Sequence, residues 1–566
     1  MAKTPDVKRL QEEHTGLETI RSDWERDWRE ISNQILPGRG INTLKVGRGG
    51  RRVRRQLISV KAVNTTPRKS LQTLSSILQS GLTSAARSWF ALKFPNDQAP
   101  KQLVLWIEES AKILLDGFTE SNFYSELDTF YNEYAGFGTA ALAMLDEEEK
   151  VFRFEPLTAG EYAYSLNSLN LPERFFRRIP YTLRQIVDQF GTENLSEELS
   201  LRVKNEEPAA MNTLYCVVQA IYREEIGDKP ITTVYFIDNT LGPTTSGLEV
   251  PKPLLVGGYY EFPIAIGRWS VLGNDPYGIG PGHHSLPNCK RLQEMERAFL
   301  QGTHKAIDPP VNVPSEMRGK IDLLPSGLNY YSNLEKRVTS VYEVRLDFQG
   351  VTAAIQRVET QIQRDFFNDL LLTATRDPDA SPLRTGEVNE KERERLIQMA
   401  PTVQRLQSEV FEMIIERGFN MMLRAGKLPP LPQNLIEQVS KFNIRITSPL
   451  AQAQKQLEAR SIESFMAFVG GAAQFDPTAL DNLETDEAIS EYHDITGAPS
   501  RILASKASVL RKRQARADQQ ARQQQIQEQA ALREADTSDT KAKAETAKIL
   551  SEAGVNLNEQ GFTLPQ

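Results

Sequence analysis

Cysteine, histidine and long apolar runs are scarce in this chain of 566 residues, and each shortage excludes a class of protein. The two cysteines, Cys216 and Cys289, lie far apart, which predicts buried thiols and neither a disulfide framework nor a cysteine-based zinc site. No apolar run approaches the ~18 residues that span a bilayer, so we expect no membrane segment. The first residues are charged and lack the apolar stretch of a secretory signal, which indicates synthesis in a cytoplasm.

Sequence motifs of catalysis are missing as well. Neither Gly-Lys pair is followed by Ser or Thr, so there is no P-loop to cradle a nucleotide. The glycines of YGIGPGHHS (277–285) lack the dinucleotide-binding register, and we interpret this stretch as a turn. His283 and His284 would lie about 30 Å along a helix from His304, which favours capping or packing roles over a metal site. We therefore assign no catalytic residue, no metal and no cofactor.

Chain length and net charge limit the possible architecture and partners of this protein. A single core rarely exceeds about 250 to 300 residues, so this chain is modular or it oligomerises. Its formal net charge of -7 argues against wholesale wrapping of nucleic acid, with one local exception. Residues 39–61, the basic arm, hold eight Lys or Arg and no acid. Phosphates of DNA and acids of a neighbouring subunit are equally open as partners for its arginines, Arg48, Arg51, Arg52, Arg54 and Arg55.

The first half of the chain changes from helical to strand patterns. Apolar residues from Leu10 to Ile35 recur at helical spacing, and the pattern ends at Leu36-Pro37-Gly38. Residues 70–95 predict a helix followed by a short aromatic strand, and residues 126–145 predict a second helix that ends in small residues. Between about 151 and 270, alternating runs predict a β-rich module. Within it, residues 181–191 form a helical pattern with a capping box, Thr182 with Gln185, and a C-cap glycine at Gly191.

The second half is mainly helical. Residues 286–307 predict a helix, which a proline-rich insert separates from a second helix. That second helix carries one apolar stripe and is polar on its other faces, which is typical of a helix that touches neighbours along a narrow seam: Val351, Ile355, Val358, Ile362, Phe366 and Leu370. A third stripe runs from Leu396 to Met413 and continues to Arg424, with a kink expected at Pro401. The last sixty residues predict a solvated helix or a disordered tail.

Several phrases together resemble the portal proteins, or head-to-tail connectors, of short-tailed bacteriophages. They occur in the family's order and cover roughly residues 20–430: LQTLSSILQSGLTSAARSWFALKFP, FYNEYAGFGTAALAML, RRIPYTLRQIVDQFG, YGIGPGHHSLPNCKRLQEMERAFLQGTHKAIDPPV and VTAAIQRVETQIQRDFFNDLL. Each phrase is a packing motif and not a catalytic signature. The resemblance implies a mixed α+β, mainly α fold, arranged as a ring, commonly of twelve subunits, around a central channel.

The resemblance also implies a division of the chain. Residues 1–280 would form the wing, 286–307 and 350–372 the stem helices, and 308–345 the clip. Residues 373–385 would form the channel, or tunnel, loop, followed by a long kinked helix over 386–425. Residues 430–566 would form the crown, a C-terminal helical barrel or a partly disordered tail. The channel assignment also has a physical basis, because the polar, proline-containing loop TATRDPDASPLRTG should border solvent.

Candidate residues follow from this division. In the channel loop, cations that could touch DNA alternate with acids that oppose it: Arg376, Asp377, Asp379 and Arg384. Stem packing is assigned to Ile355, Val358, Ile362 and Phe366, and docking of partners to clip residues Pro309, Pro310, Pro314, Arg318 and Lys320.

Partners and location are implied by the family. They are further copies of the chain in a homododecamer, double-stranded DNA passing without sequence specificity, the terminase (the packaging ATPase), tail or adaptor proteins, and the major capsid and scaffolding proteins. No membrane is implied. The protein would act in the virion, at the portal vertex, after assembly in the host cytoplasm. Two alternatives stay open: a metal-dependent DNA-processing enzyme built from scattered carboxylates, and a helical scaffold or adaptor without a channel.

Overall fold

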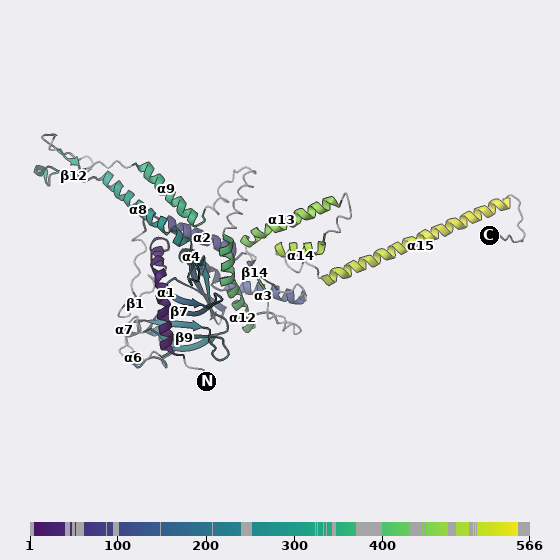
Figure 1. Ribbon diagram of the computed structural model, residues 1–566, viewed down its shortest axis with the longest axis horizontal. Coiled ribbons are helices and arrows are strands. Elements are labelled where there is room, and N and C mark those ends of the chain that lie inside the picture. Colours follow the sequence, from purple (N-terminus) through teal and green to yellow (C-terminus); the bar gives the residue numbers. More distant parts are fainter. Residues whose placement is uncertain are drawn as a thin grey trace. The chain divides into compact units, whose positions relative to one another are not determined.

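The computed structural model describes residues 5–39, 46–47, 51–52, 62–86, 88–93, 101–147, 149–205, 208–238, 252–322, 324, 327–331, 333–334, 337–341, 347–368, 399–430, 443–446, 449–473, 483–496, 502, 504 and 506–552 (Figure 1). Contacts divide the chain into two units, Met1–Leu483 and Glu484–Gln566. Each unit is described by itself.

The first unit contains a five-stranded antiparallel sheet with helices on both faces. Its strand order is β10 (Leu255–Tyr259), β9 (Ile231–Ile237), β8 (Leu214–Tyr222), β7 (Pro172–Thr182) and β6 (Tyr162–Leu166). Along β8, Val218 and Ala220 pack toward helix α1 (Val7–Gln34), while Tyr215 and Val217 pack toward the opposite face. That face is covered by α5 (Leu183–Phe190), α6 (Glu197–Lys204) and α7 (Pro208–Met211). The alternation is the period of two that a strand imposes.

Local signals in the sequence set several of these boundaries. Helix α1 begins after Asp6, whose carboxylate accepts the Lys8 and Arg9 amides, and it ends as expected before Pro37. Helix α5 has the predicted capping box between Thr182 and Gln185. Its C-cap is Gly191, at φ 75°. The expectations for the first helix, for the helix within the β-rich module and for that module itself are confirmed.

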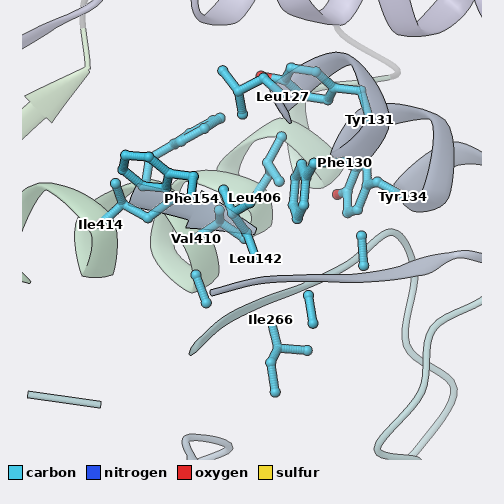
Figure 2. Packing of buried hydrophobic residues seen from close by; sticks show 14 of the residues in the cluster. Leu127, Phe130, Tyr131, Tyr134, Leu142, Phe154, Ile266, Leu406, Val410 and Ile414 are labelled. Atoms are coloured by element: carbon cyan, nitrogen blue, oxygen red, sulfur yellow. The ribbon is translucent and has the colours of Figure 1, made fainter. Parts of the chain in front are cut away.

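A second, three-stranded sheet lies within the large core of this unit. Its order is β11 (Ile264–Arg268), β4 (Thr139–Glu147) and β5 (Val151–Leu157). Figure 2 shows side chains of helix α4 (Phe123–Phe137) packed over these strands: Leu127, Phe130, Tyr131 and Tyr134 from the helix, and Leu142 and Ile266 from β4 and β11. Leu406, Val410 and Ile414, from the helical residues 399–424, lie beside them. Helices α2 (Thr66–Leu82) and α3 (Lys101–Glu120) complete this core.

The helix expected over residues 126–145 is wrong in its second half. Helix α4 ends at Phe137, because Gly138 adopts the left-handed conformation at φ 71°. The residues TAALAML that follow form β4, which pairs with β11 on one side and β5 on the other. A central strand buried on both faces has a continuous apolar run, so its sequence cannot be told from that of a buried helix by periodicity.

The remaining elements of the first unit bring distant segments together. Strand β3 (Phe90–Lys93), the short aromatic strand expected from the sequence, pairs with β14 (Asn443–Ile446), and α13 (Pro449–Ala472) follows. Residues 399–406 are helical and continue through a π-helical turn (Gln407–Phe411) into α12 (Glu412–Arg424). Helix α12 ends where the stripe predicted, at Arg424. The kink at Pro401 stays a prediction, since the residues before 399 lie outside the described part.

The second unit consists of two described helices, α14 (Thr485–Thr496) and α15 (Lys506–Glu552). An exposed ion pair of 2.6 Å joins Asp486 of α14 to Arg513 of α15. Across the described residues of both units, no helix is long and apolar enough to cross a membrane. Cys216 and Cys289 are free and buried, as expected.

A buried ionic network lies between α1 and the five-stranded sheet. The ring of His14 stacks on Phe176 with centroids 5.3 Å apart, and its Nε2 lies 3.5 Å from Glu18 Oε1. Arg178 lies 2.6 Å from the same Glu18 oxygen, and Arg21 Nη1 donates to the carbonyl of Tyr162. Burial first, and then the charges of Arg178 and Arg21, lower the pKa of His14 from 6.5 to about 3. The folded protein therefore keeps this imidazole neutral.

This depressed pKa predicts that α1 docking weakens in acid. Because the folded protein takes up the His14 proton only near pH 3, while the unfolded chain takes it up near 6.5, the stability that His14 contributes is lost as the pH falls between those values. We expect this loss to lower the free energy of unfolding by about 2 kcal/mol at pH 5 relative to pH 7. The difference between the free energies of unfolding at pH 7 and at pH 5, measured with denaturant, should therefore be about 2 kcal/mol smaller in His14→Gln than in the native chain. The matched control, His284→Gln at an exposed position, should keep the full pH dependence, and equal pH dependence in all three proteins would contradict the assignment.

Candidate functional site: a helical hairpin and its tip

Two antiparallel helices, α8 (Pro281–Ile307) and α9 (Phe348–Asp365), form a hairpin (Figure 1). Contacts at both ends fix their direction. Asn288, near the start of α8, donates to Asp365 at the end of α9 over 2.9 Å, whereas Phe299 meets Phe348 edge-on at the other end, with centroids 6.0 Å apart. The four stripe residues are buried: Ile355, Val358, Ile362 and Phe366. Their role in packing a stem stays a prediction.

Helix α8 begins at Pro281, five residues before the predicted start. A proline is favoured at the first helical position, where its missing N–H leaves no hydrogen bond unmade. The amide of Gly280 donates to Nδ1 of His283, so this histidine caps the helix as expected. Burial lowers the pKa of His283 to about 4. The turn assigned to 277–285 is therefore correct only up to Gly280, and the rest of that stretch is helix.

The root of the hairpin is a crossing of two glycine-rich backbones. A Cβ added to Gly282 would lie 2.1 Å from the carbonyl oxygen of Gly136, and one added to Gly138 would lie 2.4 Å from that of Gly278. Thr139 Oγ1 accepts the Gly278 amide at 2.7 Å and ties the two segments together. This contact brings the start of α8 against the junction of α4 and β4. The phrases YAGFGT and YGIGPG are thus the two sides of one backbone contact.

The tip of the hairpin, which we define as residues 307–341, is a short ribbon with much exposed apolar surface. Strand β12 (Val311–Asn312) pairs with β13 (Thr339–Ser340), and the Val341 amide donates to the carbonyl of Pro310 at 2.8 Å. The exposed apolar side chains of the tip are Ile307, Val313, Leu324, Leu328, Tyr330, Tyr331, Leu334 and Val341. Exposed apolar side chains gathered in one region mark interaction sites in soluble proteins.

The clip residues named from the sequence lie in this tip. Arg318, Lys320 and Pro310 are exposed, while Pro309 and Pro314 are half-buried. Along the chain, strand β12 lies between Pro310 and Pro314, and a 3-10 turn (Ser315–Met317) follows Pro314. The tip therefore holds its polar and apolar docking candidates in one region. Whether they bind a partner stays a prediction.

Described residues on both sides of the segment 369–398 contact Trp269, which follows β11. On the N-terminal side, the ring of Phe367 stacks on Trp269 with centroids 6.3 Å apart. On the C-terminal side, Arg405 Nη1 donates to the carbonyl of Trp269 at 3.4 Å. Tyr134 joins Trp269 to the C-terminal flank as well. Its ring lies 5.1 Å from that of Trp269, and its hydroxyl donates to the carbonyl of Thr402. The channel-loop residues themselves lie outside the described part: Arg376, Asp377, Asp379 and Arg384.

A known protein family matches most of this chain. A family model described as "Bacteriophage head to tail connecting protein" matches residues 7–503. The chain belongs to this family. The resemblance seen in the sequence is thereby confirmed, and the family is described by a structural role, the connection of head to tail, not by a reaction.

Two relatives of this head-to-tail connecting protein match it over nearly their whole length. The "Probable portal protein" of Bordetella phage BPP-1 is 27% identical over 578 residues and covers 100% of both chains. The "Portal protein" of Salmonella phage epsilon15 is 30% identical over 554 residues and covers 95% of this chain and 96% of its own.

Two solved structures are similar at a lower level. Chains from "Virion of native gene transfer agent (GTA) particle" and "Neck of empty GTA particle computed with C6 symmetry" are 11% and 9% identical, with TM-scores of 0.31 and 0.34. The first match covers 70% of this chain and 85% of its own, and the second 71% and 86%.

A polar joint that the sequence did not reveal fixes the hairpin of the connecting protein to the loop before α2. Gln293 of α8 accepts the amides of Val63 and Asn64 at 2.6 and 2.9 Å, and its own amide donates to the Asn64 carbonyl at 2.8 Å. The Asn64 side chain donates to Glu296 of α8 and Glu359 of α9 at 2.8 and 2.7 Å. One loop thus holds both helices of the hairpin.

The first residue of the basic arm, which spans residues 39–61, contacts the described fold. At its start, Ser32 donates to the Arg39 carbonyl, and Arg39 Nε lies 3.7 Å from the buried Glu133. Burial raises the pKa of Glu133 to about 7, against the charge of Arg39. Within the arm, β2 (Arg51–Arg52) pairs with β1 (Val46–Gly47). Arg48, Arg54 and Arg55 lie outside the described residues, so the choice between DNA and a neighbouring subunit stays open.

The end of α9 differs from the prediction of a helix to residue 372. The helix ends at Asp365, and Phe367 adopts a left-handed conformation with φ 57°. Its amide donates to the Arg364 carbonyl, and that of Asn368 donates to the Gln363 carbonyl, which is the Schellman pattern of a helix end. A phenylalanine at this position gives no sequence signal, because glycine usually occupies it. The stacking partner Trp269 holds it there.

In the described part of the connecting protein, no group of three or more His, Cys, Asp and Glu residues could hold a metal ion. His283 caps the start of α8, and His304 lies in its last turn, at the other end.

Proposed function

We propose that this head-to-tail connecting protein is a portal subunit, copies of which form a ring around a central channel at one capsid vertex. Double-stranded DNA passes through this channel during packaging and ejection, without sequence-specific contacts. The observation that carries the proposal is that Phe367 and Arg405, which flank 369–398, both contact Trp269. A segment whose ends meet beside the root of a helical hairpin can project as a loop without disturbing the core, as a channel loop must.

Roles for the other segments follow the chain. Residues 1–280 form the wing, α8 and α9 form the stem, and the segment 308–345 forms the clip. The helix that ends at Arg424, proposed to begin at 386, lies beneath the crown. Residues 430–566 form the crown or a helical barrel. The buried stripe of α9 and the glycine crossing support a rigid stem, because both join it to the wing through backbone and core contacts.

The tip of the hairpin is the proposed docking surface. Its exposed apolar side chains suit a protein partner better than solvent. Its exposed cations, which include Arg318, Lys320 and Arg337, would pair with acids of that partner. The partner is the terminase during packaging and a tail or adaptor protein afterwards, so catalysis belongs to the terminase ATPase. The wing and crown would contact the major capsid and scaffolding proteins. Assembly takes place in the host cytoplasm, and the finished protein resides in the virion.

Charge is consistent with a conduit. Each copy carries a formal charge of -7, so a ring of about twelve copies repels a duplex on average. In the proposed channel loop, Arg376 and Arg384 alternate with Asp377 and Asp379. Because each neutralised phosphate strengthens binding through counterion release, a channel lined only by arginines would hold DNA in place. Alternating signs allow it to slide.

The ring is the feature to test first. The purified full chain, alone and with its scaffolding protein, should form a closed ring with a central opening in electron micrographs, and its solution mass should be that of about twelve copies. A persistent monomer, or a small oligomer without an opening at high concentration, would favour the scaffold or adaptor alternative and end the portal proposal.

A loop deletion tests the channel assignment within the ring. We expect a variant lacking residues 375–385 to assemble rings of the native mass, because the anchors Phe367, Trp269 and Arg405 remain in place. DNA packaging or retention in assembled heads should fall at least about tenfold, since the segment that contacts passing DNA is missing. Loss of the ring in this variant, or packaging at the native level, would contradict the assignment.

A further inference from the structure

The first third of α15 carries positive charges that the helix itself does not compensate. Residues 511–522, which we call the basic segment of α15, contain Arg511, Lys512, Arg513, Arg516 and Arg522 against one acid, Asp518. Every residue from 511 to 533 is exposed. In a chain with a net charge of -7, this local excess of cations needs an explanation.

Spacing along the helix shows that four of these five cations have no oppositely charged partner within α15. Side chains three or four residues apart are neighbours on a helix, and opposite charges at that spacing stabilise it. Lys512 and Arg513 each have the like-charged Arg516 at that spacing, and Arg511 has only neutral residues. Asp518 serves Arg522 alone, and Arg513 reaches Asp486 of α14 at 2.6 Å. Three cations therefore have no acid three or four residues away on the helix: Arg511, Lys512 and Arg516.

The second half of the same helix shows the opposite pattern. Asp539 precedes Lys543 by four residues, Lys541 precedes Glu545, and Lys548 precedes Glu552, so each lysine has an acid on its own face. This half has the charge pattern of a solvated helix that stabilises itself. Because both halves are equally exposed in the described residues, exposure to water does not explain why only the basic segment keeps uncompensated cations.

We propose that the basic segment of α15 binds the phosphate backbone of double-stranded DNA. Four of the five cations in this segment are arginines. The planar guanidinium of arginine binds phosphate through two parallel hydrogen bonds. Many of its neighbours along the helix are glutamines, whose amides can donate to phosphate oxygens as well: Gln514, Gln519, Gln520, Gln523, Gln524 and Gln525. DNA is favoured over an acidic protein because this inference rests on the proposed function, in which a duplex passes each copy.

Such contacts are compatible with transport. Phosphate contacts are independent of sequence, so the segment could hold any duplex that reaches it. The basic segment also lies more than a hundred residues beyond the proposed channel loop, in the region assigned to the crown. It would hold DNA that has already passed, while the loop, with its alternating signs, stays free of tight contacts.

The experiment compares two full-length variants of equal charge. One carries Arg511→Gln, Lys512→Gln and Arg516→Gln, and the control carries Lys541→Gln, Lys543→Gln and Lys548→Gln. Binding of a linear DNA duplex is measured by fluorescence anisotropy at several KCl concentrations. Because each phosphate contact contributes ~0.9 to the slope of log K against log salt, the slope should fall by at least about 2 in the first variant and stay native in the control.

Assembly mass is measured on the same samples, so a missing ring, which would end the portal proposal, is distinguished from lost DNA contact. A native slope in the first variant overturns the inference. If that variant changes the mass of the assembly but not the slope, the cations pair with a neighbouring copy instead. If it loses binding to poly-glutamate while DNA binding stays native, the segment takes an acidic peptide, and the inference is equally overturned.

Discussion

Replacing Gly282 with alanine is expected to unfold the root of the hairpin, with a loss of at least about 3 kcal/mol in the free energy of unfolding. The added Cβ would lie 2.1 Å from the carbonyl oxygen of Gly136 and 2.9 Å from its carbon. Both are backbone atoms, so no side chain can rotate away, and α8 must move as a whole. Denaturant unfolding followed by circular dichroism and tryptophan fluorescence measures the loss.

The control for this substitution is Gly16→Ala, at an exposed position inside α1. No atom lies within 4 Å of a Cβ placed there, and alanine is the better helix former. We expect it to raise the free energy of unfolding by about 0.5 to 1 kcal/mol. If Gly282→Ala unfolds at the same denaturant concentration as the native chain, the two backbones do not touch in solution, and the glycine crossing is not what orients the hairpin.

Glycines at this crossing show how far local sequence patterns reach. The sequence predicts a turn at YGIGPG and a helix ending in small residues around YAGFGT, but nothing in either phrase indicates that they pack against each other. Helix α1, the capping box of Thr182 and the stripe of α9 followed from periodicity and end signals, because those depend on residues within a few positions. Strand β4 was missed because its burial on both faces depends on strands from elsewhere in the chain.

The candidate site divides in the same way. The helices of the hairpin and the proline-rich insert between them were predicted, since prolines end helices locally. The joint of Asn64 with Gln293, Glu296 and Glu359 was not, because it joins residues more than 200 positions apart through single polar side chains. Trp269, which anchors both flanks of the proposed channel loop, likewise carried no signal. Such residues are found only once the fold brings their partners together.

Replacing both Ile362 and Phe366 with aspartate should prevent the first unit from folding. From the sequence, the loss could fall on folding or on subunit association, because a narrow apolar seam serves either. The structure decides for folding: both side chains are fully buried within the single chain, where α9 lies against α8 and α2. Each aspartate would be buried without a partner, and we expect even the single Ile362→Asp variant to lose at least about 4 kcal/mol.

The control for the stem is Gln361→Asp, which places the same charge one residue away on the exposed face of α9. It should change the free energy of unfolding by less than about 0.5 kcal/mol. Circular dichroism, soluble yield and solution mass distinguish the outcomes. If Ile362→Asp gave a folded chain that failed only to assemble, the stripe of α9 would face a neighbouring subunit, and the packing of α9 against α8 and α2 would be wrong. If it lost helix content as a monomer, the stem would owe its stability to contacts inside one chain, and the ring would be built from preformed hairpins.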